Sequence, residues 1–142
     1  MKQKNGFSLI EVLVALVIIA IMGSVVALNL VNTTDDAKIK STQAEIDTLA
    51  NALTLYKVQQ GFLPSQQQGI EALVRAPTSA PIPPRYPQGG YLQSIDVPLD
   101  AWGRPYIYLT PGRENQPFEI ISYGADGLEG GSGADADLSN LQ

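Results

Sequence analysis

The residues with the clearest chemical potential are carboxylates near the C-terminus of this 142-residue chain. Asp126, Glu129, Asp135 and Asp137 fall within twelve residues that are rich in glycine, and no basic residue follows Arg113. Several carboxylates on a glycine-rich loop suit Ca²⁺, which takes about six to eight oxygen ligands in flexible geometry. The same composition is also typical of a solvated acidic tail, and the spacing does not match an EF-hand loop. From the residues alone, both interpretations stay open.

A second notable carboxylate is Glu11, at the head of an apolar run. The segment from Val12 to Thr34 holds 23 consecutive residues without a charge. An ionised Glu near the head of a membrane span costs about a few kcal/mol, so a partner or a function is expected for it. One alternative places Glu11 in the lipid headgroup layer. Another is a secretory signal cleaved near Ala27, against which the Glu inside the apolar region argues.

Composition excludes most other side-chain chemistry. The chain contains no Cys and no His, which removes thiolate nucleophiles, His-based triads and the usual Cys/His zinc sites. A net charge of −5 repels phosphate backbones, so nucleic acid is not an expected partner. No nucleophile and general base accompany the C-terminal carboxylates, so a membrane-anchored hydrolase using Asp126 and Asp135 is disfavoured.

The elements that must position these residues begin with one long helix. As a helix, residues 12–34 would measure roughly 35 Å, enough to cross a bilayer. Lys2 and Lys4 precede the run and Asp35 and Asp36 follow it, which predicts a cytoplasmic N-terminus. Beyond it, apolar residues at helical spacing predict an amphipathic helix that ends at Gly61. These residues are Ile39, Ile46, Leu49, Leu53 and Tyr56.

The remaining residues predict a small domain of mixed structure. Ser65 can cap a short helix that ends before Pro77, and the proline-rich residues 76–90 predict an extended loop. Two β-rich runs, Tyr106–Leu109 and Phe118–Ile121, predict an antiparallel hairpin.

The N-terminal string Gly6-Phe7-Ser8-Leu9-Ile10-Glu11, after a short basic leader, resembles the class III signal of type IV pilins and type II secretion pseudopilins. The resemblance implies cleavage by a prepilin peptidase between Gly6 and Phe7, with Phe7 then N-methylated. Residues 1–6 would be the leader, 7–34 the transmembrane segment and 35–142 a periplasmic domain. The new ammonium at Phe7 could pair with Glu11 of the same or a neighbouring subunit. If the ammonium pairs with Glu11 of a neighbouring subunit, the subunits are staggered. Repeated contacts of this head-to-tail kind do not close into a ring, so they generate a helical filament.

The rest of the chain resembles the major pseudopilins of type II secretion. The matching segments are Gly61 to Pro64, Gln68 to Val74, Gly89 to Leu92, Asp100 to Tyr106 and Ser122 to Gly127. The resemblance implies an α+β, type IV pilin-like fold. In it a long N-terminal helix, transmembrane in its first half and amphipathic in its second, packs on a small C-terminal antiparallel β-sheet with a calcium loop. It further implies calcium ligation by a set of side chains and backbone oxygens: Tyr123, Asp126, Leu128, Ser132, Asp135 and Asp137.

The function implied by this resemblance is structural, not enzymatic. The chain would be the major subunit of a pseudopilus that grows from the inner membrane and drives export of folded proteins across the outer membrane. Its expected partners are further copies of itself, minor pseudopilins, an inner-membrane assembly platform and the prepilin peptidase. The alternative is the major subunit of a surface type IV pilus for adhesion or DNA uptake. The absence of Cys counts against it, since many such pilins close their C-terminal loop with a disulfide.

Overall fold

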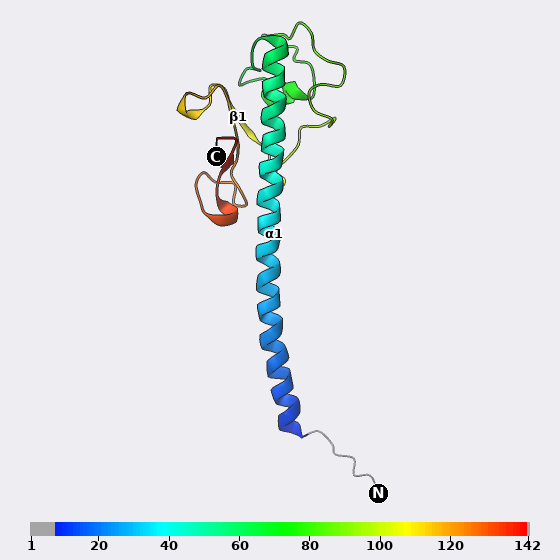
Figure 1. Cartoon of the computed structure of the whole chain (residues 1–142), viewed down its shortest axis with the longest axis vertical. Coiled ribbons are helices and arrows are strands. Elements are labelled where there is room, and N and C mark those ends of the chain that lie inside the picture. Colours follow the sequence, from blue (N-terminus) through cyan, green and yellow to red (C-terminus); the bar gives the residue numbers. More distant parts are fainter. Residues whose placement is uncertain (1–7, 142) are drawn as a thin grey trace. The chain divides into compact units, whose positions relative to one another are not determined.

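The structure, a computed structural model, describes residues 8–141, and for residues 23–33 it describes the backbone only (Figure 1). Its first element is the helix α1, Leu9–Gln60. The chain divides into two compact units with the boundary between Asp36 and Ala37, inside this helix. The predicted processing residues Gly6 and Phe7 lie outside the described residues.

Both ends of α1 are set by local hydrogen bonds. The Ser8 hydroxyl accepts from the backbone N–H of Glu11 at 3.3 Å, so Ser8 caps the first turn. At the other end, Gly61 takes a left-handed φ of 83° and its N–H donates to the Lys57 carbonyl at 2.8 Å. Glycine enters this conformation without steric cost, which explains why the helix stops here, as the sequence predicts.

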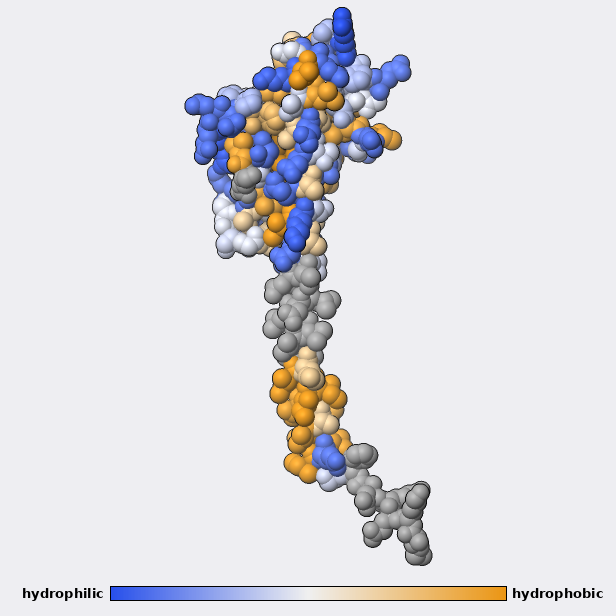
Figure 2. All heavy atoms as spheres, in the orientation of Figure 1, coloured by the Kyte–Doolittle hydropathy of each residue, from blue (hydrophilic) through white to orange (hydrophobic). Residues whose placement is uncertain are grey.

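In the first unit, apolar side chains cover every face of the described part of α1. The large apolar residues between Leu9 and Met22 are all about half exposed or more, with Leu9 at 86%. In the view of Figure 2, apolar side chains cover most of the visible face of this part of the helix, with a hydrophilic patch near its N-terminal end. Within the described residues, no helix combines the length and the hydropathy that a membrane span requires.

In the second unit, α1 supplies one side of the hydrophobic core. Ile46, Leu49, Leu53 and Tyr56 are each 0% exposed, which confirms the predicted amphipathic stripe. Tyr108, Phe118, Ile120 and Leu138 from the strands and their flanks belong to the same cluster. A helix with one apolar stripe must bury it against another element, and here that element is a small sheet.

The sheet has three antiparallel strands in the order β1-β2-β3, namely β1 Ile107–Leu109, β2 Glu119–Ser122 and β3 Leu138–Ser139. Ile107 pairs with Ile121, so the predicted hairpin is confirmed. The strand β3 is absent from the prediction. It is two residues long and pairs Leu138 with Ser122, and so short a segment carries no readable alternation. The α+β fold, a long helix with a small antiparallel sheet, is thus confirmed.

The short helix after α1 differs from its prediction. Ser65 does form a reciprocal cap, because its hydroxyl accepts from the Gln68 N–H while the Gln68 side chain accepts from the Ser65 N–H. The capped segment is a turn, however, and the helix that follows is a four-residue 3-10 helix, Ile70–Leu73. Gly69 separates the two with a φ of 60°, a conformation that no α-helix continues through.

Candidate functional site in the C-terminal loop

The acidic loop joins β2 to β3 and is closed at its neck by backbone contacts. The N–H of Ala125 donates to the carbonyl of Ala134 at 2.8 Å, and the N–H of Gly127 donates to that of Tyr123 at 3.2 Å. The two sides approach so closely at Gly124 that a Cβ there would lie 2.7 Å from the Ala134 carbonyl oxygen. The loop therefore has a defined base from which its acidic side chains project.

The predicted calcium ligands occupy this loop, and two of the carboxylates bind backbone N–H groups within it. Asp126 accepts from the Leu128 N–H and Asp137 accepts from the Gly130 N–H, each at 3.0 Å. Asp135 and Ser132 are exposed, and Leu128 is 67% exposed. Tyr123 is half-buried, beside the neck.

The donor types fit calcium, since carboxylates, carbonyls and a hydroxyl are hard oxygen ligands. Within residues 8–141, no group of three or more acidic side chains lies close enough together to hold an ion. Calcium ligation by Asp126, Asp135 and Asp137 thus remains a prediction.

A buried carboxylate, Asp100, organises the chain beneath the loop. One of its oxygens accepts from the backbone N–H groups of Trp102 and Arg104, at 3.0 and 2.8 Å. The other accepts from the Ser122 hydroxyl at 2.6 Å. Asp100 is 5% exposed and Ser122 is 1% exposed, so these bonds form largely away from water. Asp100 thereby fixes the turn that carries Arg104.

Arg104 connects this turn to the loop neck. Its Nη1 donates to the carbonyl oxygens of Gly124 and Ala125, at 2.8 and 2.7 Å. A Cβ at Gly127 would lie 2.6 Å from Arg104 Nε, so the guanidinium packs directly against a residue that has no side chain. Charge-assisted bonds of this length are the stronger kind of hydrogen bond.

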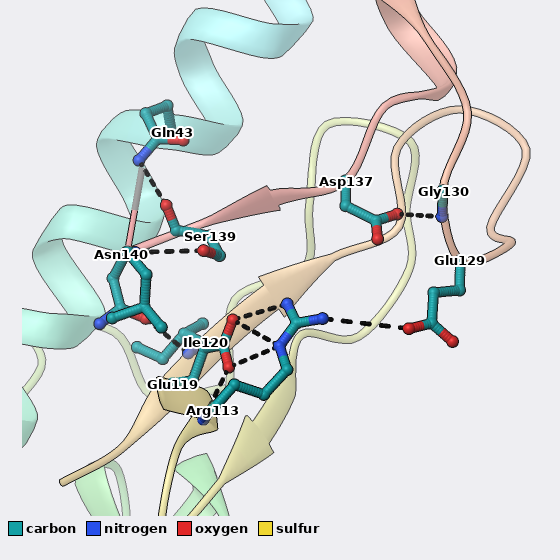
Figure 3. Close-up of polar contacts among 10 residues, drawn as sticks. Gln43, Arg113, Glu119, Ile120, Glu129, Gly130, Asp137, Ser139 and Asn140 are labelled. Atoms are coloured by element: carbon teal, nitrogen blue, oxygen red, sulfur yellow. Dashed lines mark hydrogen bonds and ion pairs between the residues drawn. The ribbon is translucent and has the colours of Figure 1, made fainter. Parts of the chain in front are cut away.

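A second arginine, Arg113, contacts the buried carboxylate of Glu119, the first residue of β2 (Figure 3). Its Nη2 lies 2.6 Å from Oε1 of Glu119 and its Nε lies 2.9 Å from Oε2, a two-pronged contact. The Glu119 side chain is 1% exposed, whereas that of Arg113 is about half exposed, at 49%. The hydrogen bonds from Arg113 lower the pKa of the Glu119 carboxyl despite the opposing effect of its burial, and raise that of Arg113. A carboxylate can stay charged at this buried position because this partner is present.

The same region joins α1, the sheet and the acidic loop through polar contacts. Gln43 of α1 donates to the Ser139 carbonyl at 3.2 Å, and Asn140 accepts from the Ile120 N–H at 2.7 Å. Arg113 Nη1 lies 3.9 Å from a Glu129 oxygen, as Figure 3 shows. The side chain of Glu129 is 73% exposed. At this exposure the last pair contributes little stability.

Sequence reasoning missed the structural roles of Asp100, Arg104, Arg113 and Glu119. In the sequence, Asp100 and Arg104 stood out only as members of the segment Asp100 to Tyr106, which matches the major pseudopilins. Their contacts with residues 122–125 join positions about twenty residues apart, and no periodic pattern in the sequence indicates them. The cap of α1 was readable, since Ser8 and Glu11 have the spacing of a capping box. Glu11 itself lies in the first turn of α1 and is exposed.

Comparison with known proteins decides the family. The family model described as type II secretion system (T2SS), protein G matches residues 29–141, and the prokaryotic N-terminal methylation motif matches residues 1–27. The chain belongs to the type II secretion system protein G family. This membership confirms the resemblance to type II secretion pseudopilins.

Relatives of this protein G family match along nearly their whole length. Type II secretion system core protein G of Pseudomonas aeruginosa is 44% identical over 139 residues, which cover 98% of this chain and 96% of that protein. The protein of the same name from Vibrio cholerae is 41% identical, and the match covers 99% of this chain and 93% of that protein. The crystal structure of the major pseudopilin from the type 2 secretion system of enterohaemorrhagic Escherichia coli aligns with a TM-score of 0.65. That structure is 32% identical and covers 79% of this chain and 93% of the solved chain.

Proposed function

We propose that this chain is the major structural subunit of a type II secretion pseudopilus, which polymerises from the inner membrane and drives export of folded proteins across the outer membrane. The observation that carries the proposal is the match of the protein G model to residues 29–141. Near-full-length relatives named core protein G favour this function over that of a surface type IV pilus. In such a filament the chain acts by packing against its neighbours, not by catalysis.

The N-terminus supplies the processing site of this proposal. The methylation motif over residues 1–27 supports removal of residues 1–6 between Gly6 and Phe7, followed by N-methylation of Phe7. The amine so formed keeps its positive charge and gives Glu11 a cation to pair with, in the same or a neighbouring subunit. A prepilin peptidase would be the enzyme responsible.

Residues 7–34 would anchor the unassembled subunit in the inner membrane, with the N-terminus in the cytoplasm and residues 35–142 in the periplasm. The support is the uncharged run from Val12 to Thr34, with basic residues before it and acidic ones after it. The exposed apolar side chains between Leu9 and Met22 need either lipid or other helices around them. Lipid would surround these side chains before assembly, and the helices of neighbouring subunits would surround them afterwards.

Further partners follow from the same role. A growing filament of identical subunits needs a platform in the inner membrane and subunits that start or end it, for which minor pseudopilins are the expected class. The net charge of −5 gives no reason to add nucleic acid to these partners.

Calcium binding at the C-terminal loop is the remaining element of the proposal. Asp126, Asp135 and Asp137 would supply carboxylates, with backbone or hydroxyl oxygens from Tyr123, Leu128 and Ser132. For a site with an affinity of about 10⁻⁴ to 10⁻³ M, calcium at ten times the dissociation constant stabilises the fold by about 1.4 kcal/mol. D126A or D135A should abolish both the heat of calcium titration and the melting shift, whereas E129A should change neither. Equal melting of the wild type in calcium and in chelator would refute calcium binding.

Secretion itself tests the proposed function. When the gene for this chain is deleted from the bacterium that carries it, the secreted proteins of the system should accumulate in the periplasm, and the wild-type gene should restore export. G6V, which blocks leader removal, should fail to restore it, whereas E129A should restore it fully. Unchanged export in the deletion strain, together with loss of surface pili, would instead favour a type IV pilus.

A further inference from the structure

Of the four arginines in the sequence, Arg85 is the one whose guanidinium forms no hydrogen bond or ion pair within the described residues. The other three bind carboxylates or backbone carbonyls. Arg85 is exposed and follows the prolines of the extended loop after the 3-10 helix. Its guanidinium is therefore available to a carboxylate of another molecule.

The backbone around Arg85 is held at two points by glutamine side chains. Gln60, which is 7% exposed, donates to the Arg85 carbonyl at 3.0 Å and accepts from the Arg85 N–H at 3.3 Å. Gln68 donates to the Pro81 carbonyl at 3.0 Å. Prolines, which fix φ, make up three of the four residues before Arg85. Residues 82–85 are thus restricted to few conformations, beside the C-terminal end of α1 (Figure 1).

This proline segment, residues 82–85, exposes apolar surface next to the cation. Ile82 is 61% exposed, and Pro84 is also exposed. Proline has no N–H to donate, so the segment can bind a partner through apolar packing and through the guanidinium. A segment that is already ordered loses little conformational entropy on binding. These features fit a groove that has apolar walls and a carboxylate at one end.

The second unit carries such a groove, of about 500 Å³, between α1 and residues 91–98. Its apolar lining includes Leu55, Tyr91 and Pro98, and Leu55 is 47% exposed. Glu45 and Leu55 lie at the two ends of the wall that α1 contributes. Within the described part of the chain, the Glu45 carboxylate forms no ion pair.

The groove and the proline segment match in length and in charge, but they cannot meet within one chain. The wall from Glu45 to Leu55 measures about 15 Å, and the residues from Ile82 to Arg85 extend over roughly 10 Å. The Arg85 backbone is bonded to Gln60, and roughly 22 Å of helix separates Gln60 from Glu45. An arginine side chain does not reach that far, so Arg85 can pair only with Glu45 of another copy.

We infer that the proline segment of one subunit docks in this groove of a neighbouring copy, with Arg85 paired to Glu45 and Ile82 packed against Leu55. The inference rests on the proposed filament, because it names a contact between the second units of neighbouring subunits. The segment and the groove are different surfaces of one chain, so the contact is heterologous and repeats from copy to copy. A contact of four residues sets the register of neighbours, while the apolar first unit drives their association.

Cysteine cross-linking in filaments tests this contact, since the natural chain contains no Cys. N51C places a thiol on the α1 wall of the groove, between its two ends. Filaments of the full chain carrying both I82C and N51C, sheared from cells that contain the secretion machinery and then oxidised, should give a ladder of disulfide-linked dimers, trimers and larger multiples. I82C alone and N51C alone should stay monomeric. I82C with D47C is the matched control, because Asp47 is exposed on α1 outside the groove lining.

Exchange of the two charges gives a second test. R85E and E45K each bring like charges together in the contact and should lower filament yield about tenfold or more. The double variant R85E/E45K restores opposite charges and should return the yield to within about threefold of the wild type. Rescue by the double variant separates loss of this pair from loss of folding in either single variant.

The results that overturn the docking differ from those that overturn the filament. Wild-type filaments with no ladder from I82C/N51C, or with an equal ladder from I82C/D47C, would refute the docking and leave the filament proposal intact. Disulfide products at masses that are not multiples of the chain would assign the groove to a different protein and also refute it. A double variant R85E/E45K no better than the single variants would refute the ion pair. Absence of filaments from the wild type would refute the proposed function, and this inference with it.

Discussion

Glu119 is a buried carboxylate whose charge depends on Arg113. E119Q removes the ionic part of the contact and should lower the free energy of unfolding by about 1 to 2 kcal/mol. R113M should lower it further, because it leaves the 1% exposed Glu119 side chain without its cation, whereas E119Q leaves only a half-exposed guanidinium that water can solvate. Chemical denaturation measures both values, and E129Q, at an exposed carboxylate 3.9 Å from Arg113, serves as a near-neutral control. An R113M variant at least as stable as E119Q would contradict this view of the pair.

The same pair predicts an acid dependence with a definite sign. Because the pKa of Glu119 is lowered in the folded state, its contribution is complete above the unfolded carboxyl value of about 4.3 and is lost as pH falls through the lower folded value. Stability below about pH 4 should therefore decline less steeply in E119Q than in the wild type. Thermal melts at pH 2 to 7 in both proteins provide the comparison, and parallel curves would show that Glu119 does not carry the effect.

Two buried tyrosines should respond oppositely to loss of the hydroxyl. The Tyr108 hydroxyl donates to the Pro64 carbonyl at 2.9 Å, while the Tyr56 hydroxyl is buried with no hydrogen-bond partner in the described structure. Y108F should cost about 1 kcal/mol, and Y56F should be neutral or slightly stabilising. Burial raises the pKa of Tyr108 to about 12, so the wild type should also lose stability as pH rises above about 10, and Y108F should lose less. A large loss of stability in Y56F would reveal a partner for its hydroxyl.

At the scale of elements, the second half of α1 is defined by its buried stripe. Leu53 is 0% exposed and Leu55 is 47% exposed, two positions along the same helix. L53A should destabilise the second unit by about 2 to 5 kcal/mol through the cavity that it creates, and L55A by less than about 1 kcal/mol. Urea unfolding of the two variants gives the comparison directly. Similar losses for both would mean that the exposed face of α1 is also packed.

Elements with a strong local pattern were predictable, and contacts between distant segments were not. The stripe of α1 repeats at helical spacing and ends at a glycine, so its end at Gln60 follows from the sequence. The two β-rich runs likewise predict the hairpin. The strand β3 could not be predicted because its two residues become a strand only by pairing with Ser122. The Arg104 contacts were also unreadable, since a guanidinium that binds carbonyls twenty positions away leaves no local pattern.

At the scale of the whole molecule, the two units have different proposed roles. The first unit, up to Asp36, exposes apolar side chains that gain most from burial against lipid or other copies. The second unit, from Ala37, has its own core, and among its described buried side-chain polar atoms only the hydroxyls of Tyr56 and Tyr106 lack a hydrogen-bond partner. A fragment from Ala37 to Gln142 should therefore be monomeric at micromolar concentration, because it lacks the segment that drives association.

The central claim is that the full chain polymerises after processing at its N-terminus. The most direct measurement is electron microscopy of filaments sheared from cells that express the chain with its secretion machinery, combined with intact mass of the subunit. We expect filaments built from a chain that begins at an N-methylated Phe7, and few or none from E11L despite normal membrane insertion. Wild-type filament yield from E11L would refute the role of Glu11. Absence of filaments from the wild type, or subunits that begin at Leu28, would contradict the claim itself.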